Sequence, residues 1–269
     1  SAGVNRLSLG LQALDDAALK FLGRAHDARE GMAALDAAQR VVDRVSIDLI
    51  YARPDQSAAQ WEAELARALA FGTEHLSLYQ LTIEPGTRFE TDVRLGQFTP
   101  ADPDFAAELF ELTQAMTLAA GRPAYEVSNH AKPGAESRHN LAYWRYADYV
   151  GVGPGAHGRR MEMATTRHKK PENWQSALTR NGHGLVEERA LASDERAAEA
   201  LMMGLRLAEG VDLAALAERT GTVRDALVDE TAVARLHAHG LLIRDGNHLT
   251  VTPAGMLLLD GILAEIVAV

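Results

Sequence analysis

The sequence predicts an α/β protein, with a parallel sheet and intervening helices followed by a small helical domain of winged-helix shape. Three short apolar segments, at 6–12, 45–51 and 75–81, are separated by helical sequence, which is typical of parallel βαβ units. From about Ser193, helical patterns precede a hairpin and a last helix. The 269 residues suffice for two domains, which we expect at 1–190 and 191–269.

Each of the three expected strands carries a polar residue at or near its C-terminal end. The strands are Arg6–Gln12, Val45–Tyr51 and His75–Leu81. In sheets of this class, ligands bind at the carboxyl ends of the strands, where the loops are free to vary. We therefore expect function at Gln12, Asp48 and Tyr79–Thr82, although a strand-end polar residue also often caps the following turn.

Helices between and after these strands are expected from their capping residues. The first covers the alanine-rich segment Asp27–Arg40, and the second, Ser57–Phe71, begins with Ser57 as its N-cap. A third, Asp102–Ala120, has proline at its first helical position and a glycine after its end. We expect a further short strand at Tyr125–Val127.

The second domain is expected to be acidic. Its helices are predicted at 193–207, 212–219 and 223–239, its hairpin strands at 241–244 and 249–252, and its last helix from Pro253. From Ser193 onward the chain has 6 arginines, no lysine and 12 Asp and Glu residues, which gives a formal charge of −6. Because phosphate would be repelled, we expect no nucleic acid among the partners.

Composition excludes several other classes of site. The chain has no cysteine, so it supplies no thiolate for a zinc site or an iron–sulfur cluster, and we expect no metal ligands in it. The net charge of −10 disfavours binding to anionic membranes. The first residues do not form a signal peptide, and the apolar tract 256–269 is interrupted by Asp260 and Glu265, so we expect a cytoplasmic protein.

The segment Asp148–Gly158 has the most unusual composition. Within it, Gly151–Ala156 fits the formal dinucleotide pattern G-x-G-x-x-G/A. However, Pro154 and Gly155 interrupt the helix that such a site needs at the pyrophosphate. A tight turn that brings the backbone close to a ligand is the better interpretation.

A histidine precedes a cluster of aromatic residues. His139 lies shortly before Tyr143, Trp144 and Tyr146, which would offer a flat apolar wall with an imidazole at its edge. Such an arrangement suits a planar macrocycle with an iron ligand. Packing of the aromatic side chains in the core is the alternative interpretation.

Five segments together resemble the radical S-adenosylmethionine (SAM) heme chaperone family, often labelled oxygen-independent coproporphyrinogen III oxidase-like. In chain order they are Gly3–Gln12, Ile47–Gln56, Leu76–Pro85, His139–Trp144 and Gly155–Gly158. The resemblance implies the C-terminal part of a partial (β/α)6 radical SAM barrel, from about its fourth strand, followed by a small helical winged-helix-like domain. It also implies that the [4Fe–4S] loop belongs only to the parent protein, so that this fragment alone is predicted to be inactive.

The resemblance assigns candidate site residues. Gln12, Arg24 and Asp48 match positions that contact SAM in this superfamily, and their side chains suit hydroxyl, ammonium and carboxylate groups. Lining of the same pocket is implied for Tyr79, Thr82 and His157. His139 lies in the motif that is proposed to bind heme in the chaperone branch.

Two functions follow from the resemblance. The first is a heme-binding chaperone that delivers heme to respiratory proteins, and His139-Asn140-x-x-Tyr143-Trp144 favours it. The second is an oxygen-independent coproporphyrinogen III dehydrogenase, an oxidative decarboxylase of porphyrin biosynthesis. A third interpretation is a scaffold, in which an exposed strand edge at Arg6–Gln12 pairs with another chain to form a homodimer.

The sequence departs from the family in one loop. Tyr51-Ala52-Arg53-Pro54 stands where the family usually has tyrosine, glycine, leucine and proline. Because Ala52 replaces a glycine and Arg53 replaces an apolar residue, we expect this loop to be reshaped.

Overall fold

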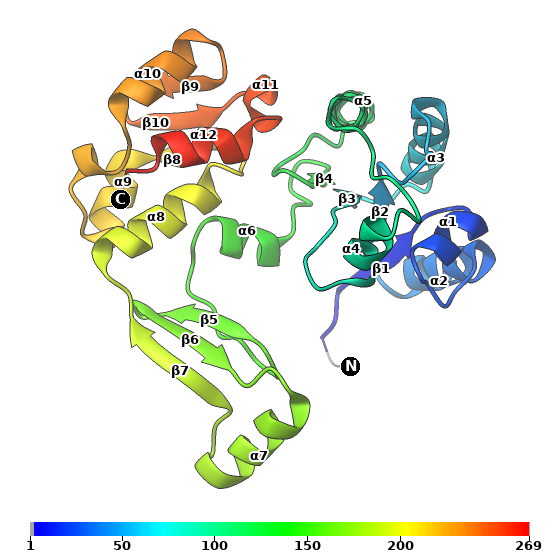
Figure 1. The fold of residues 1–269 in the computed structure, drawn as a ribbon, viewed down its shortest axis with the longest axis horizontal. Coiled ribbons are helices and arrows are strands. Elements are labelled where there is room, and N and C mark those ends of the chain that lie inside the picture. The colour runs from blue at the N-terminus through cyan, green and yellow to red at the C-terminus, as the bar shows by residue number, and fades with distance from the viewer. Residues whose placement is uncertain (1–2, 269) are drawn as a thin grey trace. The chain divides into compact units, whose positions relative to one another are not determined.

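The computed structural model describes residues 3–268 (Figure 1). Contacts within the chain divide it after Glu136 into an N-terminal unit and a C-terminal unit. The domain boundary expected after residue 190 would lie within the C-terminal unit, and it stays a prediction.

The N-terminal unit is built on a four-stranded sheet. Strands β1 (Arg6–Gln12), β2 (Arg44–Tyr51) and β3 (His75–Gln80) are parallel and lie side by side in that order. This arrangement confirms the three predicted strands and their direction. The fourth strand, β4 (Asn129–Ala131), pairs with β3 in the antiparallel direction.

The strand expected at Tyr125–Val127 is wrong by four residues. Glu126 instead belongs to a turn, in which its carboxylate accepts the N–H of Ser128 at 3.1 Å. The N–H of Tyr125 bonds to the carbonyl of Asn129. The polar side chains thus close a turn, and the strand begins after it.

The three helices expected in the N-terminal unit begin at their predicted caps, and two short helices, α1 (Asp16–Phe21) and α4 (Arg88–Arg94), were not expected. The three expected helices are α2 (Ala28–Val41), α3 (Ala58–Ala70) and α5 (Pro103–Ala119). Capping boxes at Asp27 with Glu30 and at Ser57 with Gln60 fix the starts of α2 and α3. Asp102 caps α5, and Pro103 takes its first position.

One face of the sheet is apolar and the other is polar. Leu11, Ile47, Leu49 and Leu76 pack with side chains of α2, α3 and α5 in a single core. The alternate residues of the same strands are mostly small or polar, with Ile50 as an apolar exception. Parallel strands covered by helices on both faces usually read as continuous apolar runs. The alternation therefore places the helices on one face and leaves the other for polar groups.

The first part of the C-terminal unit holds a short helix and an antiparallel sheet that the sequence analysis did not anticipate. The helix is α6 (Arg138–Trp144), and the sheet has the order β5 (His157–Arg160), β6 (Met163–Arg167) and β7 (Leu185–Ala190). Helix α7 (Pro171–Asn181) connects β6 to β7. All but one of the residues of β7 are exposed, which explains why its sequence lacks an apolar alternation.

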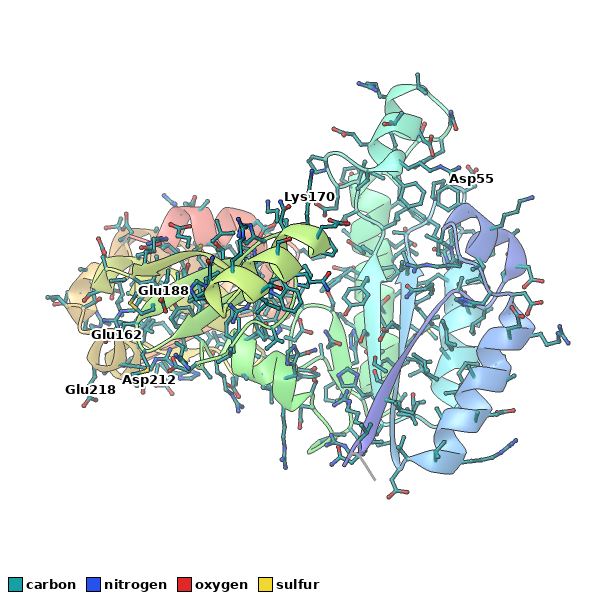
Figure 2. All side chains as sticks on the ribbon, turned by 90° about the horizontal axis from the view of Figure 1, so that it is seen from below. Asp55, Glu162, Lys170, Glu188, Asp212 and Glu218 are labelled. Carbon is teal, nitrogen blue, oxygen red and sulfur yellow. The ribbon has the colours of Figure 1, made fainter. Side chains whose placement is uncertain are left out.

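The rest of the C-terminal unit has the expected hairpin and most of the expected helices, but the last helix is divided into two and a two-residue strand was not expected. It contains α8 (Ser193–Gly204), β8 (Val211–Asp212), α9 (Leu213–Thr220), α10 (Glu230–Ala238), β9 (Leu242–Asp245), β10 (His248–Val251), α11 (Pro253–Met256) and α12 (Leu259–Ile266). The single helix expected at 223–239 is instead a 3-10 turn at Arg224–Ala226 followed by α10. Asp229 caps a new helix start with its carboxylate and so separates the two. Figure 2 shows the side chains of Asp212 and Glu218 in this acidic part.

Candidate functional site

Asp48 lies near the carboxyl end of β2 on the polar face of the sheet. It is in register with Gly10 of β1 and Ser77 of β3. The Ser8 hydroxyl donates to Asp48 Oδ1 at 3.0 Å. Burial raises the pKa of Asp48, whereas hydrogen bonds from Ser77 and Ser8 act in the opposite direction. Neighbouring strands thus hold a half-buried carboxylate in a fixed orientation.

Gln12 is brought to the same place by an irregularity at the end of β1. The pairing register shifts between Gly10 and Gln12, and Gln12 has a φ of 69°. Its side chain folds back over Gly10, because a Cβ at Gly10 would lie only 2.4 Å from Gln12 Nε2. Since Gly10 pairs with Asp48, the Gln12 amide and the Asp48 carboxylate share this end of the polar face.

Three other predicted residues have different positions. Tyr79 is 42% exposed and pairs in register with Ile50, one step beyond Asp48 and Ser77. Partial burial is the main cause that raises its pKa, and the nearby Asp48 carboxylate adds to it. Thr82 is exposed and follows the end of β3. Arg24 is exposed in the loop between α1 and α2, where its backbone N–H bonds to the carbonyl of Leu19.

The polar face continues into residues that the sequence analysis missed. Asn129 of β4 pairs with Ser77, and its side-chain amide donates to the buried carboxylate of Glu126. Burial raises the pKa of Glu126. The available signal was the run of small polar residues at alternate strand positions, Ser8, Ser46 and Ser77, in otherwise apolar segments.

A hydrogen-bonded trio lies one step toward the amino ends of the strands. Ser46 Oγ is 2.7 Å from His75 Nδ1, and Tyr125 Oη is 2.9 Å from His75 Nε2. Burial lowers the pKa of His75 to about 3, and the positive charge of Arg6 adds to the effect. Both ring nitrogens of this neutral histidine therefore have partners within the fold, which indicates a structural role.

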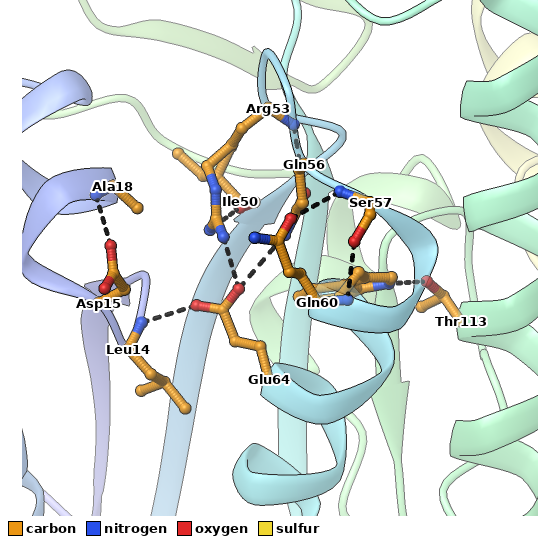
Figure 3. A network of polar contacts seen from close by, with 11 residues as sticks. Leu14, Asp15, Ala18, Ile50, Arg53, Gln56, Ser57, Gln60, Glu64 and Thr113 are labelled. Atoms are coloured by element: carbon orange, nitrogen blue, oxygen red, sulfur yellow. Dashed lines mark hydrogen bonds and ion pairs between the residues drawn. The ribbon is translucent and has the colours of Figure 1, made fainter.

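The reshaping expected of the loop after β2 stays a prediction, and the structure shows how Ala52 and Arg53 are placed in it. Ala52 has a φ of 54°, a conformation that favours glycine, and it is followed by a buried Arg53 (Figure 3). The Arg53 guanidinium donates to the carbonyl of Ile50 at 2.8 Å and to Glu64 Oε2 at 2.6 Å. The chain then turns outward, and Asp55 is exposed (Figure 2).

Glu64 on α3 joins this loop to the segment after β1. Its Oε1 accepts the backbone N–H of Leu14 at 2.7 Å, and its Oε2 also accepts from Gln56 Nε2 at 3.3 Å (Figure 3). The two loops that follow β1 and β2 are therefore tied together by one buried carboxylate. This tie supports the strand ends that carry Gln12 and Asp48.

The glycine-rich segment packs against the chain itself. The backbone of Tyr149 pairs with Arg159 of β5, and a Cβ at Gly151 would lie 2.1 Å from the carbonyl oxygen of His157. No helix begins within Gly151–Ala156, which agrees with the rejection of a dinucleotide site. The close backbone approach expected here is thus to β5, and the side chain of His157, the first residue of β5, is exposed.

His139 lies in the first turn of α6 with its side chain exposed. Its ring centroid is 4.9 Å from that of Tyr143, with the rings at 62°, and Tyr143 lies 4.2 Å from Tyr149. Trp144 and Tyr146 have other partners, the guanidinium of Arg206 and the carboxylate of Glu199. The expected aromatic wall is therefore a ladder of His139, Tyr143 and Tyr149, with the imidazole at its exposed end.

Residues 3–268 contain neither a cluster of metal ligands nor a membrane-spanning helix. No group of three or more His, Asp or Glu side chains among them is placed to hold a metal ion. Within the same range, no helix is both long and apolar enough to cross a membrane.

Comparisons with known proteins agree with these features. The family model of the HemN C-terminal domain matches residues 191–258. The mouse mitochondrial protein named radical S-adenosyl methionine domain-containing protein 1 is 40% identical over 274 residues, which are 98% of this chain and 62% of that protein. The chain thus spans less than two thirds of the length of this relative.

Two bacterial relatives and one solved structure extend the comparison. The heme chaperone HemW of Escherichia coli is 34% identical, with 97% of this chain and 68% of that protein covered. HemW of Bacillus subtilis is 31% identical, with 96% and 68% covered. A structure described as coproporphyrinogen III oxidase (HemN) from Escherichia coli, a radical SAM enzyme, matches with a TM-score of 0.79.

That structure is 21% identical and covers 97% of this chain and 64% of its own, so it shows the fold. It confirms the C-terminal part of a radical SAM barrel followed by a winged-helix-like domain. The sequence identity to HemW over nearly the whole chain confirms the family expected from the motifs. The chain belongs to the heme chaperone HemW family of radical SAM proteins.

Proposed function

We propose that this chain is the heme-binding part of a heme chaperone, which holds heme for transfer to respiratory proteins. The exposed imidazole of His139 at the end of the aromatic ladder carries the proposal. A histidine imidazole is a common axial ligand of heme iron, and aromatic faces suit the macrocycle beside it. Relatives named heme chaperone support the same function.

We expect His139→Ala to weaken the binding of ferric heme to this chain by at least about tenfold, because the variant loses its axial ligand. The measurement is a heme titration followed by the Soret band. His239→Ala is the matched control, since His239 is exposed after α10 in the same unit and should leave affinity unchanged. Equal heme affinity and an equal spectrum in His139→Ala and the wild type would remove the assignment.

We also propose that the strand ends of the N-terminal unit bind SAM. Asp48 and Gln12 supply a fixed carboxylate and an amide, which fit the hydroxyl and ammonium groups of this ligand. Tyr79 and Thr82 lie at the end of the neighbouring strand, and Arg24 offers a cation for the ligand carboxylate. His157 stays a proposed SAM contact on the resemblance alone.

Asp48→Asn is expected to lower the affinity for SAM about tenfold, because a charge-assisted hydrogen bond contributes about 1.5–3 kcal/mol. Equilibrium dialysis with labelled SAM measures the effect. Asp43→Asn is the control, since Asp43 is exposed just before the opposite end of β2. The same SAM affinity in the Asp48 and Asp43 variants would argue against this site.

The [4Fe–4S] cluster of the family does not fit the residues of this chain, which has no cysteine to ligate iron. In a longer protein that carries the cysteines, the cluster and SAM together would supply one-electron chemistry. What the present residues contribute is binding and orientation of SAM at the strand ends and of heme at α6. We also propose that respiratory proteins accept the heme.

Two further expectations stay proposals. The homodimer expected from the sequence stays a proposal. The mouse relative is named as mitochondrial, and the cytoplasmic location predicted from the sequence stays a prediction.

A further inference from the structure

The C-terminal end of α6 is clamped by residues that lie much later in the chain. Arg145, which follows the helix directly, forms a two-pronged ion pair with Glu209, with both nitrogen–oxygen distances at 2.7 Å. Arg219 of α9 donates to the carbonyl of Arg145 at 2.9 Å. The helix that carries His139 is thus fixed at its far end, while its first turn is exposed.

A second clamp is centred on Glu199 of α8. The hydroxyl of Tyr146 donates to Glu199 Oε2 at 2.5 Å, and Arg159 of β5 donates to both carboxylate oxygens, at 2.9 and 2.7 Å. These bonds lower the pKa of Glu199, chiefly through Arg159, and keep it ionised. One carboxylate on helix α8 therefore joins Tyr146, two residues after α6, to strand β5.

The backbone at Tyr146 shows that this contact holds an unfavourable conformation. Tyr146 has a φ of 53°, which costs a residue with a bulky side chain free energy that surrounding contacts must offset. The hydrogen bond to Glu199 is such a contact. Two backbone bonds also close this turn, from the N–H of Tyr146 to the carbonyl of Tyr143 and from the N–H of Ala147 to the carbonyl of Ala142, both at 2.8 Å. Glu199 therefore adds a side-chain restraint to a helix end that the backbone already closes.

Glu199 also reaches the aromatic ladder by a second route. Its partner Arg159 pairs through both backbone hydrogen bonds with Tyr149, at 2.6 and 3.1 Å. Tyr149 contacts Tyr143, and Tyr143 contacts His139. Glu199 is therefore linked to the imidazole by two chains of contacts, through Tyr146 along the chain and through Arg159 and the ladder.

We propose that Glu199 is a positioning residue for His139, through which helix α8 fixes the orientation of the heme-binding helix. This inference rests on the proposed binding of heme at α6. It also gives the segment matched by the HemN C-terminal domain, which includes Glu199, a role in ligand binding. Side chains that hold a metal ligand in place commonly matter for metal affinity nearly as much as the ligand does.

The test compares Glu199→Ala with Glu195→Ala, one turn earlier on α8. Glu195 forms an ion pair with Arg189 of β7 and so is matched in charge, helix and partner type, but it touches neither Tyr146 nor Arg159 in its hydrogen bonds. We expect Glu199→Ala to weaken ferric heme binding about tenfold and to give a mixture of coordination states in electron paramagnetic resonance. Glu195→Ala should match the wild type in both readouts.

Tyr146→Phe removes only one arm of the clamp and keeps the pair of Glu199 with Arg159, so it serves if Glu199→Ala does not fold. It should shift the heme spectrum in the same direction by a smaller amount. A wild-type affinity and spectrum in either folded variant would overturn the inference. If His139→Ala itself binds heme like the wild type, the proposed ligand fails and the role of Glu199 falls with it; if only His139→Ala loses heme, the ligand stands and this inference alone is wrong.

Discussion

Glu64→Ala is expected to lower the free energy of unfolding of the N-terminal unit by about 3–5 kcal/mol, as when one partner of a buried ion pair is removed. The variant leaves the buried guanidinium of Arg53 without its carboxylate and the N–H of Leu14 without its acceptor (Figure 3). Urea unfolding followed by hydrogen exchange at the amides of β3 measures the loss in this unit. Glu62→Ala, on the exposed side of the same helix, should change the free energy by no more than about 0.5 kcal/mol.

A second pair of variants separates the ion pair from its packing. Arg53→Leu restores the apolar residue of the family. Combined with Glu64→Gln it leaves no buried charge, while the side-chain amide introduced by the second change can still accept the N–H of Leu14. We expect this double variant to recover most of the stability that Glu64→Ala loses, because apolar replacements of buried ion pairs are often nearly neutral. A double variant as unstable as Glu64→Ala would show that the charges themselves are not the cause.

Acidification from pH 6.5 to pH 5 is expected to destabilise the N-terminal unit by up to about 4 kcal/mol, from two buried histidines at about 1.4 kcal/mol per pH unit each. Burial lowers the pKa of His75 to about 3 and that of His130 to about 4, below the usual value of 6.5. Between these values the unfolded chain binds more protons than the folded chain. The stabilisation is therefore complete above pH 6.5 and is lost as the pH falls.

Buried carboxylates act in the opposite direction at lower pH. The pKa values of Asp48 and Glu126 are raised by burial, so protonation of these groups favours the folded state as the pH approaches their range. We therefore place the test above pH 5. His75→Gln should reduce the slope of stability against pH by about 1.4 kcal/mol per unit. Ser46→Ala removes a hydrogen bond to His75 but keeps the histidine, so it should lower stability without changing the slope.

The parallel strands could be predicted from the sequence because their pattern is local. Apolar residues and caps indicated β1, β2 and β3 and the starts of α2, α3 and α5 within a residue or two. The sheet β5–β6–β7 was missed because its strands are short, charged and largely exposed, so no apolar period marks them. Asp229 shows a similar limit. It lies inside a continuous helical pattern, and its role as the N-cap of α10 is seen only in the folded structure.

The residues of the candidate site could be predicted from the sequence, but the hydrogen-bond partners that hold them in place could not. The resemblance selected Asp48, Gln12 and His139, and the structure shows Asp48 and Gln12 at one end of the polar face. Their supports are Ser8, Glu64 and Glu199, which act across 40, 50 and 53 residues of sequence through hydrogen bonds to Asp48, Leu14 and Tyr146. Such partners depend on tertiary structure, so no local pattern announces them.

Heme transfer measured against porphyrinogen turnover tests the central claim most directly. A longer form of the protein that includes a cluster-binding segment would be loaded with heme and mixed with an apo respiratory cytochrome, and separately incubated with SAM, reductant and coproporphyrinogen III. We predict a heme spectrum that depends on His139, passage of heme to the acceptor and no decarboxylation. Formation of protoporphyrinogen, with no heme bound or transferred, would contradict the account and identify the chain as part of a coproporphyrinogen III dehydrogenase.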